Sequence, residues 1–178
     1  MAVIKGKTTR IGPGHVPNAK LLPLPQTTRD LYSKVTLCVD FFYVNGVPLL
    51  LTISRSFKFR TVEETSNRNQ RTMLDGIMKA VKLYKVRGLT VVNIHTDNEF
   101  ECCRDGLSPI VLDIAGAGMH VREVKKSIWM VKEQVRCTTH NRPFKNYPKV
   151  LVTGCVNYNI KRLNNLLKVL LSVDLFKF

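Results

Sequence analysis

The fold is indicated most directly by residues 35–54, which read Val35-Thr-Leu-Cys-Val-Asp40-Phe-Phe-Tyr-Val44, then Asn45-Gly46, then Val47-Pro-Leu-Leu-Leu-Thr-Ile-Ser54. Both outer segments are rich in apolar, β-branched and aromatic residues, which favour strands. Asn-Gly suits a tight type I′ turn, because both central residues of that turn have positive φ. The stretch therefore predicts a β-hairpin with strands at Val35–Val44 and Val47–Ser54.

Outside the hairpin, the hydrophobic pattern predicts further strands and helices in a mixed order. Apolar residues recur at helical spacing between Thr65 and Arg87, and Gly88 is typical of a helix end. Leu89–Thr96 is mostly apolar, so we expect a fully buried strand there. The remaining expected elements are strands at Phe57–Val62 and Ile110–Ala115, helices at Val121–Cys137 and Val150–Val173, and a loop at Pro143–Pro148. This order predicts an α/β fold.

The chain length of 178 residues suits one domain of ordinary size. Residues 1–33 contain several prolines and scattered basic residues, so we expect an extended basic lead-in. Residues 34–150 are expected to form the folded core. Residues 151–178 are expected to form a C-terminal helical segment.

The composition is strongly basic, with 28 Lys and Arg against 13 Asp and Glu and a formal net charge of +15. Such an excess favours a polyanionic partner, because phosphate contacts release counterions. An anionic membrane is the competing partner. However, no segment reaches the roughly 18–20 apolar residues of a membrane span, and the N-terminus lacks a signal-peptide pattern. We therefore expect an intracellular protein that binds nucleic acid rather than membrane.

The cysteines and histidines do not predict a metal site. Neither a CxxC pair nor an HxxxH pair occurs, and an odd number of irregularly spaced cysteines does not predict a disulfide framework. We expect reduced cysteines. The five cysteines are at positions 38, 102, 103, 137 and 155, and the four histidines at 15, 95, 120 and 140.

Two aspartates stand in strand-like apolar segments. Asp40 interrupts the first strand of the hairpin, and Asp97 ends the segment from Leu89. A buried carboxylate costs several kcal/mol unless it is paired, hydrogen-bonded or bound to a cation. Two such residues indicate a pair that holds a divalent metal. The alternative is that each caps a turn or pairs with one of the many Lys and Arg residues.

A collinear series of short stretches also matches a known family. The stretches are Gly6–Arg10, Val35–Asp40, Val44–Gly46, Thr52–Arg55, Lys58–Thr61, Tyr84–Gly88, Thr96–Glu101, His120–Val121, Lys132–Cys137, Pro143–Lys145 and Tyr147–Lys149. This series resembles the integrase catalytic core encoded by copia-type retrotransposons. The resemblance implies an RNase H-like α/β fold, a mixed five-stranded sheet flanked by helices, over residues 34–150.

The resemblance also implies a chemistry. Such integrases use two Asp and one Glu to hold two divalent metals, Mg²⁺ or Mn²⁺, which activate the attacking hydroxyl and stabilise the leaving oxygen in DNA strand transfer. Asp40 and Asp97 match the first and second carboxylates. DNA is then the partner, the nucleus the implied location, and a homo-oligomer is compatible with the family.

At the third carboxylate position the sequence departs from the family, because Lys125 stands there. Helical spacing places Lys125 at the edge of the apolar face, so we expect its ammonium within reach of Asp40 and Asp97. We therefore expect weak metal binding and impaired catalysis. Glu123 is a candidate substitute, although it lies on the other flank of the expected helix. Glu133 has the spacing from Asp97 that is familiar in wider integrases, but helical geometry directs it away from the apolar face.

The same helix carries five basic residues that are candidates for DNA contact: Arg122, Lys125, Lys126, Lys132 and Arg136. The alternative is a solvated helix face, and the resemblance favours DNA. Trp129 is expected to pack against a neighbour. The primary functional hypothesis is metal-dependent DNA strand transfer in an impaired form. The alternatives are a non-catalytic nucleic-acid-binding module derived from a transposon, and a structural role in a larger polyprotein.

Overall fold

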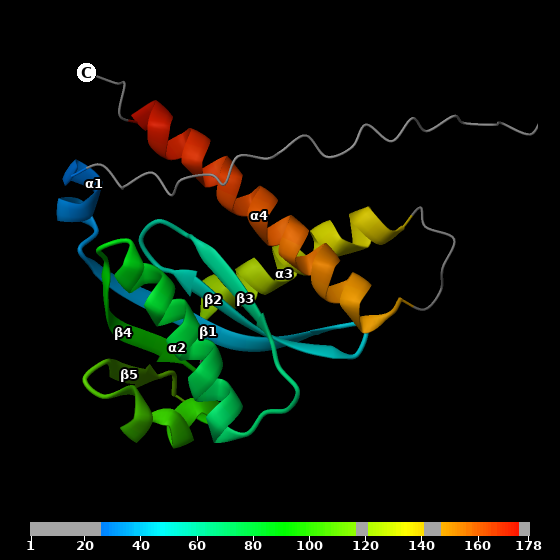
Figure 1. The fold of residues 1–178 in the computed structure, drawn as a ribbon, viewed down its shortest axis with the longest axis horizontal. Helices are drawn as coiled ribbons and strands as arrows, with labels where there is room; N and C mark the ends of the chain where they lie inside the picture. Colours follow the sequence, from blue (N-terminus) through cyan, green and yellow to red (C-terminus); the bar gives the residue numbers. More distant parts are fainter. Residues whose placement is uncertain (1–25, 117–120, 141–146, 175–178) are drawn as a thin grey trace, which may run out of the picture.

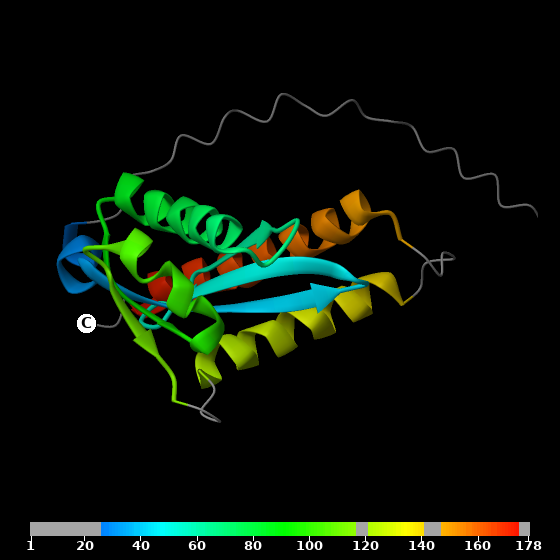
Figure 2. The ribbon, with the colours of Figure 1, turned by 90° about the horizontal axis from the view of Figure 1, so that it is seen from below.

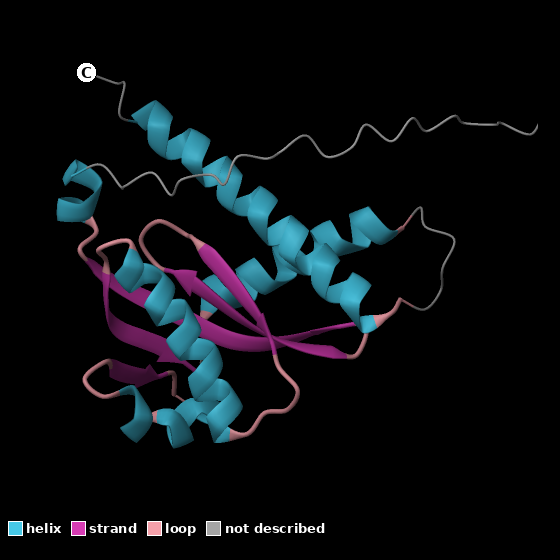
Figure 3. Ribbon diagram, viewed as in Figure 1, coloured by secondary structure: helices cyan, strands magenta, loops and turns pink. Residues whose placement is uncertain are grey.

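The computed structural model describes residues 26–116, 121–140 and 147–174. Within these ranges a five-stranded sheet is covered by helices on both faces (Figures 1 and 3). The elements are α1 (Gln26–Leu31), β1 (Lys34–Val44), β2 (Val47–Ser54), β3 (Arg60–Glu64), α2 (Gln70–Val86), β4 (Thr90–Thr96), the 3-10 helices η1 (Asn98–Cys103) and η2 (Asp105–Leu107), β5 (Val111–Ile114), α3 (Arg122–Thr139) and α4 (Lys149–Asp174).

The sheet is mixed, with strand order β3-β2-β1-β4-β5. The three strands β1, β2 and β3 form an antiparallel meander, whereas β4 and β5 run parallel to β1. The predicted hairpin is confirmed, because Asn45 and Gly46 have φ values of 47° and 77° and connect β1 to β2. The predicted mixed five-stranded sheet is confirmed as well.

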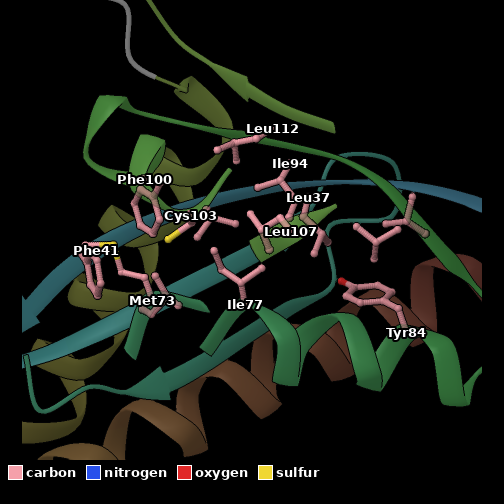
Figure 4. Close-up of a cluster of buried hydrophobic side chains, with 14 of the residues drawn as sticks. Leu37, Phe41, Met73, Ile77, Tyr84, Ile94, Phe100, Cys103, Leu107 and Leu112 are labelled. Atoms are coloured by element: carbon pink, nitrogen blue, oxygen red, sulfur yellow. The ribbon is translucent and has the colours of Figure 1, made fainter. Parts of the chain in front are cut away.

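Two hydrophobic clusters lie on opposite faces of the sheet. One lies between the sheet, α2 and the 3-10 helices, and it includes Phe41, Ile77 and Phe100 (Figure 4). The other lies between the sheet, α3 and α4, and it includes Val131 and Val156. Figure 2 shows α2 and α3 on opposite sides of the sheet. Strand β1 is buried because it lies at the centre of both clusters.

The open edge of the sheet at β3 is fastened to α3 and α4. Oδ1 of Asn164 accepts the Arg60 backbone N–H at 3.0 Å, and Nδ2 of Asn164 donates to the Arg60 carbonyl at 2.8 Å. The buried Arg60 side chain donates from Nε to Oγ of Ser127 at 2.8 Å, and burial lowers the pKa of its guanidinium. The expected boundary at 150/151 falls inside α4, whose first turns contribute to the core.

Several predicted boundaries need correction. Helix α2 begins at Gln70 rather than Thr65, because Oδ1 of Asn69 accepts the Thr72 backbone N–H at 2.9 Å and caps the helix. Strand β3 begins at Arg60 rather than Phe57. The prediction that the fourth strand is fully buried is wrong: β4 has an exposed or half-buried residue at four of its seven positions, since its neighbour β5 is only four residues long.

The expected lead-in and loop are only partly described. Residues 26–31 form the short helix α1 rather than an extended segment. Residues 1–25 and most of the predicted loop at 143–148 lie outside the described residues. In the part of the chain that is described, no helix combines the length and the apolar character needed to cross a membrane.

Candidate functional site

Asp40 on β1 and Asp97, the residue that follows the last residue of β4, stand at matching positions of two neighbouring parallel strands. The register pairs Cys38 of β1 with His95 of β4, and each aspartate lies two residues further along its chain. Residues two apart in a strand point to the same face, and adjacent strands lie about 4.8 Å apart. Asp97 keeps an extended backbone, with φ −92° and ψ 176°. The register therefore directs both carboxylates to one face of the sheet, where β1 and β4 run side by side (Figure 1).

Asp40 is a buried carboxylate held against α3. Its side chain is 7% exposed, and its Oδ2 lies 2.8 Å from Nζ of Lys125, whose side chain is 45% exposed. Oδ2 of Asp40 accepts no hydrogen bond of good geometry, so the attraction is chiefly electrostatic. Oδ1 of Asp97 is also buried and accepts no hydrogen bond from the described residues. The predicted contact between Lys125 and the first aspartate is confirmed.

The Lys125 ammonium determines the electrostatics of this site. Two neighbouring carboxylates repel each other, and burial penalises the charged form of each. A cation in contact with Asp40 offsets both effects. The same positive charge repels a divalent metal ion.

The two glutamates of α3, Glu123 and Glu133, form ion pairs with arginines rather than with groups of the candidate site. Oε1 of Glu123 lies 3.3 Å from Nε of Arg55, just beyond β2. Oε2 of Glu133 lies 3.1 Å from the Arg136 guanidinium on the exposed side of α3. No group of three or more His, Cys, Asp or Glu side chains that could hold a metal occurs within the described residues. Asp40 and Asp97 alone, with a lysine beside them, do not fit a two-metal centre.

The parallel strands bring a further polar pair to the same face. Nδ1 of His95 lies 2.7 Å from Oδ2 of Asp113, its register partner on β5. His95 precedes Asp97 by two residues, so both point to the same side of β4. Cys38 precedes Asp40 in the same way, and burial raises the pKa of its thiol to about 11, with the Glu123 carboxylate adding to the shift. The sequence did not predict that Cys38, His95 and Asp113 belong to this face, although the alternation of His95 with Asp97 was a usable signal.

The basic residues that are candidates for DNA contact lie along α3, the helix whose Lys125 contacts Asp40. Arg122, Lys126 and Arg136 are exposed, and Lys132 is half-buried. Arg136 forms the ion pair with Glu133. The described residues provide no ion-pair partner for Arg122, Lys126 or Lys132. These three side chains therefore carry uncompensated positive charge at the surface.

The prediction that Trp129 packs against a neighbour is wrong. Trp129 is 63% exposed. The buried stripe of α3 contains Val124, Ile128, Val131 and Val135. At about 100° per residue, Trp129 lies roughly 130° from the centre of that stripe, so its indole projects from the helix into solvent.

Comparisons with known proteins show similarity in structure only. No protein-family model matches the sequence, and no curated protein shows significant similarity to it. The structure is similar to the HTLV-2 integrase catalytic core domain in complex with magnesium (trimeric form), with TM-score 0.50, 15% identity and coverage of 79% of this chain and 84% of that chain. The chain has the RNase H-like fold of integrase catalytic cores. The catalytic core domain of BIV integrase also matches, with TM-score 0.49, 11% identity and coverage of 71% and 78%, respectively.

The similarity to the HTLV-2 integrase core confirms the predicted fold class. At 15% identity it concerns the fold alone. The chemistry therefore depends on the residues of this chain itself. The relevant ones are the two aspartates, the lysine that contacts one of them, and the basic surface of α3.

Proposed function

We propose that this chain is an integrase-like core of copia type whose parent activity is metal-dependent DNA strand transfer, and that Lys125 blocks this activity. One observation carries the proposal: Nζ of Lys125 lies 2.8 Å from Oδ2 of the buried Asp40. In this proposal the ammonium pairs with Asp40 in the place that a metal ion would take. The integrase-like fold and the parallel register of the strands that carry Asp40 and Asp97 support the assignment.

The implied cofactor is Mg²⁺ or Mn²⁺, bound weakly. The HTLV-2 integrase core is a complex with magnesium, and the same ion suits carboxylate ligands. A metal ion held in such a site would supply Lewis-acid chemistry for phosphoryl transfer. In this chain Asp40 and Asp97 are the proposed ligands. With Lys125 at the third position, we propose negligible strand transfer.

A second candidate function is nucleic-acid binding without catalysis. It is favoured by the formal charge of +15 and by the exposed basic residues of α3. DNA is the proposed partner and the nucleus the proposed location, and assembly into a homo-oligomer is compatible with either function. Under this proposal α3 contacts phosphates through Arg122, Lys126, Lys132 and Arg136.

The proposal is tested by exchanging the charge at position 125. We expect the unmodified chain to bind Mg²⁺ and Mn²⁺ weakly in calorimetric titrations and Lys125→Glu to bind both ions more tightly. Lys126→Glu is the matched control, since it makes the same charge change at the next, exposed residue of α3. Strand transfer of an oligonucleotide end into plasmid DNA is then measured for all three proteins.

Three outcomes separate the candidates. Tighter metal binding in Lys125→Glu but not in Lys126→Glu supports the blocked site. Tight binding by the unmodified chain, unchanged in Lys125→Glu, would show that another acid such as Glu123 completes the site and that the chain is not impaired. DNA binding that is absent, or insensitive to salt, would remove both functions in favour of a structural or partner-binding role.

A further inference from the structure

The exposed indole of Trp129 lies one helical turn beyond the candidate site. Trp129 is 63% exposed on α3 and follows Lys125 by four residues. The described residues provide no ring contact or cation–π partner for it. A tryptophan buries a large apolar surface when it finds a partner. Its exposure on a basic face of α3 therefore points to a ligand.

The surroundings of Trp129 are cationic. At about 100° per residue, Arg122 lies roughly 20° from Trp129 around α3, and Lys126 and Lys132 lie roughly 60° to either side. None of these three has an ion-pair partner among the described residues. The acid on the same side, Glu133, is already paired with Arg136 at 3.1 Å. The indole is therefore surrounded by positive charge that is available to phosphate groups.

We infer that Trp129 is a stacking platform for an unpaired nucleobase, and that Arg122, Lys126 and Lys132 hold the phosphates of the same strand. Aromatic rings within a positive surface bind single strands by stacking on base faces, which duplex DNA keeps covered. The inference rests on the proposed nucleic-acid binding and adds a preference for single-stranded DNA over blunt duplex.

The position of Trp129 relates this platform to the candidate site. Lys125 contacts Asp40 and is followed one turn later by Trp129, so both lie on the same side of α3. A base stacked on the indole would place the adjoining phosphates near Asp40 and Asp97. The platform thus suits a frayed or single-stranded end at the place where the chemistry of an active relative would occur.

The test uses the full chain and two probes, a fluorescein-labelled oligo(dT) and a blunt duplex of equal length. For Trp129→Ala we expect a loss of affinity of about tenfold or more for oligo(dT) and less than about twofold for the duplex, as measured by anisotropy. Trp129→Tyr should recover most of the affinity. Tyr158→Ala is the matched control, because Tyr158 is another exposed aromatic residue and lies on α4.

A second readout uses the unmodified chain and unlabelled DNA. Trp129 is the only tryptophan of the chain, so its intrinsic fluorescence reports directly on its own environment. We expect unlabelled oligo(dT) to quench this fluorescence and the blunt duplex to leave it largely unchanged.

The outcomes distinguish this inference from the proposed function. If oligo(dT) and duplex bind but cause no quenching, or if Trp129→Ala weakens both equally, DNA binding stands and the platform does not. The same two results are expected if Trp129 contacts a protein partner instead of a base, and they would overturn the inference. If the unmodified chain binds neither probe, the nucleic-acid function fails together with the inference.

Discussion

Nζ of Lys125 on α3 lies 2.8 Å from Oδ2 of Asp40, a buried carboxylate on the central strand of the sheet. The contact joins residues that are 85 positions apart in the sequence (125 − 40). It fixes the start of α3 against β1 by an attraction between opposite charges. Asp40 therefore has a counter-ion within the protein, and this has consequences for stability as well as for metal binding.

Replacing Lys125 by Met should destabilise the protein by about 1–3 kcal/mol, because it leaves the buried Asp40 charge without a partner. Asp40→Asn in the same chain should recover most of this loss, since the neutral amide needs no counter-charge. Urea unfolding of the single and double variants measures the coupling. Equal stability of Lys125→Met and the unmodified chain would show that the ion pair contributes nothing.

The affinity for duplex DNA should fall steeply with salt, with a slope of log affinity against log salt of about 0.9 per phosphate contact. Replacing Arg122, Lys126 and Lys132 together by Ala should reduce that slope by about 2–3 for every sequence tested. The control removes three lysines from the opposite face of the sheet, Lys79, Lys82 and Lys85 on α2. A loss confined to one DNA sequence would contradict backbone recognition by α3.

Two helical glycines should respond in opposite ways to alanine. A Cβ at Gly76 of α2 would lie 2.6 Å from Cδ2 of Leu50, so Gly76→Ala should destabilise by about 1–3 kcal/mol. A Cβ at Gly154 of α4 would meet nothing within 4 Å, so Gly154→Ala should stabilise by up to about 1 kcal/mol. Thermal unfolding of both variants checks the packing of α2 on the sheet. Similar shifts for the two would show that α2 does not lie this close to β2.

Stability should decline at alkaline pH partly because of Tyr84. Burial raises the pKa of its hydroxyl above the ordinary value of 10.0, so the folded state keeps a proton that the unfolded state releases. Its contribution is fully present below about pH 10 and is lost as pH rises through the folded pKa, by up to about 1.4 kcal/mol per pH unit. Tyr84→Phe should flatten this decline in urea titrations between pH 9 and 11. The exposed Tyr43→Phe is the control and should not change it.

The parts of the fold that depend on local sequence were predictable. The hairpin follows from Asn45-Gly46 and its apolar flanks, and α3 follows from the spacing of its valines. Boundaries failed where a side chain competed with the hydrophobic pattern, as Asn69 does by capping α2 five residues after the expected start. The parallel pairing of β1 with β4 is non-local, and the sequence predicted only that the sheet is mixed and five-stranded.

The site was predictable where helical geometry alone decides the outcome. The angle of Lys125 to the apolar stripe placed it at the edge of the core, and its contact with Asp40 is confirmed. The same helical geometry places Trp129 on the solvent side of α3, contrary to the expected packing against a neighbour. The pair of His95 and Asp113 was missed because it depends on the register between two parallel strands.

The two hydrogen bonds between the Asn164 side chain and the Arg60 backbone also oppose association of the sheet with that of another copy of the chain. An edge strand offers unpaired N–H and C=O groups on which a strand of another chain can add. Here an amide side chain of α4 takes up the outward-facing groups of Arg60, and the helix crosses the open edge of β3. A chain shortened to residue 150 would keep all five strands and still expose that edge to intermolecular sheet growth.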